Sequence, residues 1–188
     1  MSRFFNRALR VLLLANGLIL TAAATLGPIY SLFVKEIGGD LLDASLTFAI
    51  FSIVAALVTF VSGKLSDKVR HSVWVIVMGY LLVGMGFLLY LFVYSLLSLF
   101  LVQVIIGFGE AIYAPAFDKL YSKHLMSHLA GTAWGAWESL RYLTLAIGAV
   151  LGGIVVTRLG FDTLFVIMGL MSFASAAYLA NRHRVFKG

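Results

Sequence analysis

Long apolar runs recur along the whole chain, and short polar segments separate them. A run of about 20 mostly apolar residues is what a helix needs to cross about 30 Å of hydrocarbon. We therefore predict an all-α membrane protein whose single domain covers residues 1–188. The apolar windows indicate six transmembrane helices, with approximate bounds 9–34, 44–63, 73–94, 95–117, 130–157 and 163–180. The first run continues well past the small residues Ala22 to Ala24, so we expect it to remain as a span rather than be removed as a signal peptide.

The clearest polar interruption is GKLSDKVRHS, residues 63–72, which lies between two apolar runs. Sliding the sequence on itself by 90 residues places GKLSDKVRHSVWVIVMG (63–79) over GIVVTRLGFDTLFVIMG (153–169). An offset of 90 residues covers three predicted helices, and an odd number of helices reverses the orientation of the second copy. The pattern therefore predicts a 3+3 inverted repeat, with repeat 1 at about 9–94 and repeat 2 at about 95–180.

Composition supports a membrane protein and excludes several other classes. The chain is 62% hydrophobic and only 12% charged, against about 25% charged residues in soluble domains. It has no cysteine, so disulfides, thiol catalysis and Cys-ligated metals are excluded. The net charge of +6 could suggest nucleic acid, but its distribution fits topology instead. If both termini are cytoplasmic, eleven Lys and Arg residues lie inside and only Lys35 and Arg158 lie outside, as the positive-inside rule expects.

The polar segment also carries a family resemblance. Gly63, Leu65, Asp67 and Lys68 resemble the loop between spans two and three of the major facilitator superfamily of secondary transporters, although Arg70 stands where that family usually has glycine. The resemblance implies that these five residues form a cytoplasmic gating loop, in which Asp67 anchors a charge network that favours one of two conformations. Without the resemblance, the same basic residues would only anchor the topology of a tight turn.

Members of this superfamily have twelve spans, so the chain looks like one half of such a transporter. The resemblance implies alternating access about a site near the bilayer midplane. A homodimer with two-fold symmetry would supply the complete fold. A shortened chain, or a chain that pairs with a different half, would fit the same pattern. We expect an integral protein of the plasma membrane whose partners are the lipid bilayer, a second copy and a small-molecule substrate.

Three charged residues lie inside predicted spans, where each costs about 2.5–3.5 kcal/mol to insert. These are Glu110, Glu138 and Arg141, and the last two share a helix face. If Gln103 and Glu110 face the same interior, two carboxylates meet one guanidinium. The unpaired carboxyl could then carry a proton, or Arg141 could hold an anionic substrate. The alternative is a structural salt bridge. Gln103 stands where many family members have arginine, so no proton-coupling role is carried over to it.

Further residues complete a predicted substrate cavity. Asn16 and Tyr113 are candidates for its wall, and Trp134 and Trp137 could stack on a substrate ring or form part of an interfacial aromatic belt. No phosphate-binding loop motif occurs, and no histidine shares a span with a candidate nucleophile or metal ligand. We therefore predict no enzyme activity, no cofactor and no metal. The rival interpretation is a non-transporting membrane assembly or lipid-handling protein in which the charges are structural.

Overall fold

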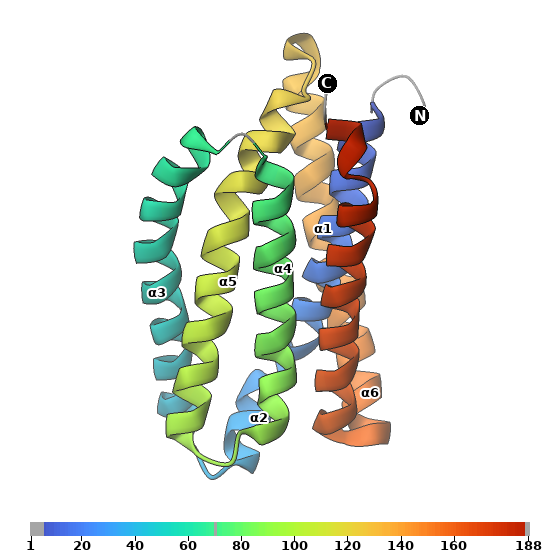
Figure 1. The fold of residues 1–188 in the computed structure, drawn as a ribbon. Coiled ribbons are helices and arrows are strands. Elements are labelled where there is room, and N and C mark those ends of the chain that lie inside the picture. The colour runs from blue at the N-terminus through green and yellow to red at the C-terminus, as the bar shows by residue number, and fades with distance from the viewer. Residues whose placement is uncertain (1–5, 70, 187–188) are drawn as a thin grey trace.

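The computed structural model describes residues 6–69 and 71–186, which form a bundle of long helices that run up and down (Figure 1). In chain order the elements are α1 (Arg7–Leu26), η1 (Gly27–Ile29), α2 (Tyr30–Glu36), α3 (Leu41–Lys68), α4 (Ser72–Leu89), η2 (Tyr90–Phe92), α5 (Leu96–Lys123), η3 (Ser127–Leu129), α6 (Ala130–Asn181) and η4 (His183–Phe186). These two ranges contain no strand. The prediction of an all-α protein is confirmed.

Five helical stretches in the described part of the chain are long and apolar enough to cross a membrane. The last of them, Ser127–Asn181, has 55 residues, more than twice what one crossing needs. Its backbone leaves the helical conformation at Gly160, where φ is 80° and ψ is 174°. Glycine adopts positive φ without the strain that a Cβ causes. The parts of α6 before and after Gly160 consequently run in opposite directions (Figure 1).

Local hydrogen bonds explain where several helices begin. The Asp40 carboxylate accepts from the Asp43 amide at 2.9 Å, and Asp43 accepts from the Asp40 amide at 2.9 Å, which forms a capping box before α3. Ser95 and Ser98 form the same arrangement before α5. Both boxes lie at the end of the bundle that also holds the Gly160 turn, opposite the two termini (Figure 1). The α3–α4 and α5–α6 links lie at the end with the termini.

The structure differs from the sequence prediction at the polar segment 63–72. Gly63, Leu65, Asp67 and Lys68 are not in a loop but in the last turns of α3, which ends at Lys68. Lysine, serine and aspartate can continue a helix when its terminal carbonyls find donors. Here one side chain from α5 supplies those donors, as described below. Arg70 lies outside the described residues.

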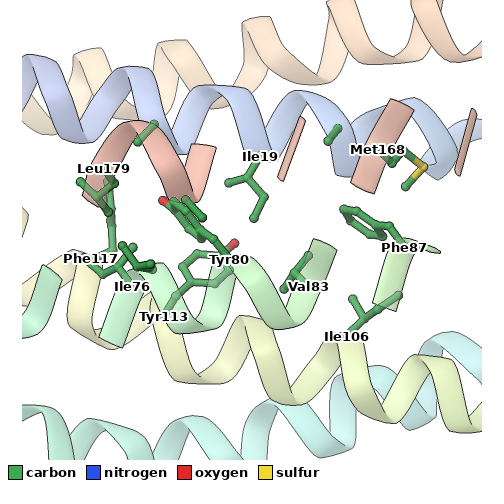
Figure 2. Packing of buried hydrophobic residues seen from close by; sticks show 14 of the residues in the cluster. Ile19, Ile76, Tyr80, Val83, Phe87, Ile106, Tyr113, Phe117, Met168 and Leu179 are labelled. Atoms are coloured by element: carbon green, nitrogen blue, oxygen red, sulfur yellow. The ribbon is translucent and has the colours of Figure 1, made fainter. Parts of the chain in front are cut away.

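Glycines let neighbouring helices approach until their backbones touch. A Cβ on Gly79 of α4 would lie 2.9 Å from the Gly109 carbonyl oxygen of α5, and one on Gly148 of α6 would lie 2.9 Å from the Thr21 carbonyl oxygen of α1. Gly152, one turn further along α6, faces the Thr25 carbonyl. Small residues at such crossings are typical of membrane helices, which gain little from apolar burial against one another. Larger apolar side chains fill the remaining space between the helices (Figure 2).

The outer faces of two helices are almost entirely apolar and exposed. Only 11% of the most apolar window of α3 is buried, and 17% of that of Ser127–Asn181, compared with 61% for Arg7–Glu36. Leu57 and Phe60 of α3 are 67% and 69% exposed, and Val150 of α6 is 62% exposed. Contiguous apolar surface of this extent suits contact with lipid or with another protein.

The α1–α6 crossing predicts opposite responses at two adjacent glycines. Gly152→Ala should destabilise the protein by about 1–3 kcal/mol, the usual cost of overpacking, because its methyl would overlap the Thr25 carbonyl. Gly153→Ala is the matched control, since nothing lies within 4 Å of its Cβ position and both changes gain similar helix propensity. Thermal unfolding in detergent would measure both. Equal melting temperatures for the two variants would contradict this account of the crossing.

Candidate functional site

A cavity of about 270 Å³ opens among the buried faces of the helices. Its wall is mainly apolar and aromatic, and Figure 2 shows Ile19, Val83, Phe87, Ile106, Tyr113 and Met168, which all line it. Tyr30, Gln103 and Glu110 supply its principal polar groups. Apolar walls with a few polar groups are typical of small-molecule sites, which usually measure about 300–1,000 Å³. We call this space the central cavity.

Tyr30 lies at the centre of a hydrogen-bond relay on the wall of the central cavity. Gln103 Nε2 of α5 donates to the Tyr30 hydroxyl, which in turn donates to Thr47 Oγ1 of α3 at 2.8 Å. The Thr47 hydroxyl donates to the Ala44 carbonyl at 2.8 Å and is fully buried. The phenol of α2 therefore connects three helices, because its two partners come from α3 and α5.

The break between α1 and α2 places Tyr30 at this position. The 3₁₀ turn Gly27–Ile29 contains Pro28, which has no amide hydrogen and cannot complete a regular helical ladder. α2 then begins at Tyr30. Sequence analysis did not select Tyr30 as a site residue. The signal that could have found it is a tyrosine directly after Gly-Pro inside an apolar span.

Glu110 supplies the carboxylate of the central cavity. It lies near the middle of α5, thirteen residues before Lys123, or about 20 Å along the helix at 1.5 Å per residue. No described cation lies within 4.0 Å of it, because Arg141–Glu138 is the one ion pair found among residues 6–69 and 71–186. Glu110 lines the central cavity and is nevertheless exposed in the single chain.

Asn16 and Tyr113 lie close together but play different parts. Tyr113 lines the central cavity, while Asn16 is buried behind it and does not. The Tyr80 hydroxyl donates to Asn16 Oδ1 at 2.7 Å, and the Tyr80 and Tyr113 rings meet edge to face with centroids 4.9 Å apart. Asn16 therefore orients Tyr80, which in turn packs against the cavity residue Tyr113.

Glu138 and Arg141 pair with each other away from the central cavity. Arg141 Nε and Nη2 donate to one Glu138 carboxylate oxygen at 3.0 and 2.8 Å. The side chains of Arg141 and Glu138 are 41% and 49% exposed, and neither lines the central cavity. Within a single chain, then, the two carboxylates and one guanidinium do not form one cluster. Arg141 pairs with Glu138, one turn earlier in the same helix, and Glu110 lies apart from this pair in the central cavity.

Trp134 and Trp137 pack against aromatic rings of α5. The Trp134 ring lies 5.1 Å from that of Tyr121, and the Trp137 ring lies 5.0 Å from that of Phe117, centroid to centroid. The Tyr121 hydroxyl also donates to the Ala133 carbonyl at 2.6 Å. Both tryptophans are partly buried, and neither lines the central cavity. In this structure they join α5 to the beginning of α6.

Lys119 of α5 closes the carboxyl end of α3. Its ammonium donates to the backbone carbonyls of Ser66, Asp67 and Val69, the last two at 3.3 and 3.2 Å. A cation at this position also interacts favourably with the negative end of the helix dipole. The helical course of Gly63 to Lys68 is thus supported by Lys119, one of the eleven Lys and Arg residues that sequence analysis counted as cytoplasmic.

These observations agree with the comparison to known families. The profile of the Major Facilitator Superfamily matches residues 12–185 of the chain. This chain belongs to that superfamily. As a member of this transporter family it is an integral membrane protein, and the exposed apolar faces of α3 and α6 are consistent with that setting.

Curated members of the superfamily share low identity with the chain over most of its length. "Multidrug resistance protein MdtG" of Erwinia billingiae is 24% identical over 186 residues, which cover 95% of this chain and 45% of the relative. The protein of the same name from Yersinia enterocolitica is 25% identical and covers 89% and 41%. "Uncharacterized MFS-type transporter YuxJ" of Bacillus subtilis is 26% identical and covers 94% and 45%. The chain spans less than half the length of each.

The relay predicts energetic coupling between Tyr30 and Gln103. Tyr30→Phe and Gln103→Leu should each lower the free energy of unfolding, and the double variant should lose less than the sum, with a coupling of about 0.5–1.5 kcal/mol. Unfolding by SDS in mixed micelles would measure all three. Tyr94→Phe is the control, because Tyr94 is 81% exposed and outside the relay. Strict additivity of the two changes would contradict the relay.

Proposed function

We propose that this superfamily member is half of a secondary transporter, which moves a small solute by alternating access around the central cavity. A second copy of the chain supplies the other half, and Glu110 carries a proton during the cycle. The observation that carries the proposal is the central cavity itself, which combines apolar and aromatic walls with a carboxylate near the middle of α5 that lacks a described cationic partner. The named multidrug relatives support transport without fixing this chain's substrate.

The contacts of two glycines support the proposed inverted repeat. Gly17 of α1 and Gly107 of α5 are ninety residues apart, the same offset that aligns the two halves of the sequence. A Cβ on Gly17 would lie 3.4 Å from Leu140 of α6, and one on Gly107 would lie 2.9 Å from the Phe51 carbonyl oxygen of α3. If the two parts of α6 around Gly160 are counted as spans five and six, α1 is span one, α3 is span two and α5 is span four. The two glycines then mark contacts of span one with span five and of span four with span two. Exchanging the two three-span repeats converts one contact into the other.

The exposure of Glu110 supports a shared aqueous chamber. An ionisable group at membrane depth normally faces a bundle interior or a water-filled space, because lipid does not solvate it. In a single chain Glu110 is on an open side of the bundle. A second copy that covered this side would enclose the carboxylate within a chamber of protein and water. We further propose that the dimer lies in the plasma membrane with both termini of each copy on the cytoplasmic side, as the positive-inside rule expects.

The least buried helices support a particular geometry for the homodimer. α3 and the part of α6 before Gly160 carry many exposed large apolar side chains, such as Leu57, Phe60 and Val150. A two-fold axis along the membrane normal would place α3 of each copy against α6 of the other. The contact would then form twice and would cover the exposed apolar faces of both helices in both copies. The start of α3 and the Gly160 turn lie at the same end of the bundle. Ile53 lies thirteen residues after Asp40, and Ile147 lies thirteen residues before Gly160. Both are therefore about 20 Å from that end.

Replacing Glu110 should separate proton movement from binding. The protein would be reconstituted into liposomes and presented with sugars, amino acids, organic anions and lipophilic cations, while an internal dye reports pH. With at least one compound the native chain should move protons together with the solute. Glu110→Gln should abolish accumulation driven by a pH gradient, because an amide cannot exchange a proton.

Two comparisons sharpen this experiment. Glu36→Gln is the matched control, since Glu36 is exposed at the end of α2 and does not line the central cavity. Glu138→Gln tests whether the paired carboxylate contributes. Unchanged coupling in Glu110→Gln would remove Glu110 as the carrier. No compound moved by the native chain would favour the non-transporting alternative.

The homodimer can be tested by cross-linking, because the chain contains no cysteine. A chain with both Ile53→Cys and Ile147→Cys should form dimers in membranes on treatment with a bismaleimide. Both positions are exposed, at 59% and 44%, so the substitutions should not disturb packing. Dimer yield on denaturing gels is the measurement. Each single substitution should give far less dimer, because α3 faces α6 in the proposed arrangement.

Ile147→Cys with Leu170→Cys provides the control pair, since Leu170 is 60% exposed but follows Gly160. Equal dimer yields from the two double variants would indicate random collision. Only monomers from both would argue against a homodimer and for a different second half.

A further inference from the structure

A second cavity, of about 320 Å³, lies between α4, α5 and η4 at the end of the bundle that carries the termini. We call it the end cavity. Its polar lining consists of His71, Ser72, Lys119, Lys123 and His183, and none of the described residues that line it is acidic. Its volume falls within the range of small-molecule pockets, about 300–1,000 Å³. The end cavity lies apart from the central cavity, with which it shares no lining residue.

The charges of the end cavity are all positive. The Lys119 ammonium donates to uncharged backbone carbonyls of α3, so its charge is not neutralised by that contact. The Lys123 ammonium forms no hydrogen bond with another described residue and is exposed at the carboxyl end of α5. His183 Nδ1 contacts the Ala180 carbonyl at 2.8 Å, which leaves Nε2 available. Its ring lies 5.6 Å from that of Trp74.

Two neutral groups also suit an anion. Ser72 is 6% exposed and lines the end cavity, yet its hydroxyl bonds to no other described residue. Ser72 is the first residue of α4, whose N-cap residue His71 provides no side-chain cap. Free amides at the start of a long helix attract negative charge. An unbonded hydroxyl on a buried serine, uncapped amides and two lysines therefore border the same space.

We propose that the end cavity binds a phosphate group, carried either by an anionic lipid headgroup or by a soluble phosphate. Phosphate oxygens accept charge-assisted hydrogen bonds from lysine and ordinary ones from serine and backbone amides. The position suits a headgroup, because α5 ends here, where a membrane surface would lie. It suits a soluble anion equally, because the cavity is open to water. Binding here would join α4, α5 and η4 independently of any solute in the central cavity.

The test uses the full chain in nanodiscs and in neutral detergent. In the lipid arm, nanodiscs of phosphatidylcholine with or without phosphatidylglycerol are compared, and native mass spectrometry counts the retained anionic lipid. In the soluble arm, inorganic phosphate is titrated in detergent against chloride at equal ionic strength, and the melting temperature is followed. In whichever arm the native chain binds, Lys123→Met should weaken that binding by about tenfold, as expected for the loss of one charge-assisted hydrogen bond. Lys123→Arg should retain it.

Lys64→Met is the matched control, because Lys64 is an exposed lysine of α3 that lies over the Phe60 ring and does not line the end cavity. It removes the same charge and should leave binding unchanged. A response in the lipid arm alone identifies a headgroup, and a response in the soluble arm identifies a free phosphate. Equal loss in Lys123→Met and Lys64→Met would indicate general surface charge and overturn the proposal, as would no response in either arm.

Discussion

Helices in a bilayer gain little by burying apolar side chains against one another, so their association depends on close packing and hydrogen bonds. Here the main reason is close backbone approach, which requires that side chains be missing at the crossings. Gly148 and Gly152 let α6 lie against α1, and Gly79 lets α4 lie against α5. The helices that meet at these glycines also line the central cavity, with Ile19 from α1, Val83 from α4, Ile106 from α5 and Met168 from α6.

The long apolar segments could be predicted from sequence because their signal is strong and local. Each run of about 20 apolar residues has few alternatives to a membrane helix, and the first predicted span, 9–34, falls within Arg7–Glu36. The turn between the last two predicted spans coincides with Gly160. The end of α3 was harder to predict, because the polar residues from Gly63 to Lys68 indicated a loop. Their helical course depends on Lys119, which is fifty residues away and invisible to any local pattern.

The candidate site was only partly predictable for a related reason. Sequence spacing placed Glu138 and Arg141 on one face, and the structure shows them hydrogen-bonded to each other. It could not show whether that face meets Glu110, because this depends on how α5 and α6 are rotated. Tyr30 was missed because its role depends on partners from two other helices. Both outcomes follow from tertiary geometry that one helix does not encode.

The 3₁₀ turn between α1 and α2 has a mechanical consequence. At Pro28 the ladder of backbone bonds is interrupted, so the rod formed by α1 and α2 is less stiff there than along its length. The longer segment packs on α6 through backbone contacts. The shorter one bonds to α3 and α5 through the Tyr30 hydroxyl and packs Phe33 against Tyr90, Phe161 and Phe165. A small tilt of the shorter segment would therefore exchange the Tyr30 hydrogen bonds and shift the Phe33 ring against its aromatic neighbours. It would alter the width of the chamber near Tyr30 while the α1–α6 seam keeps its shape.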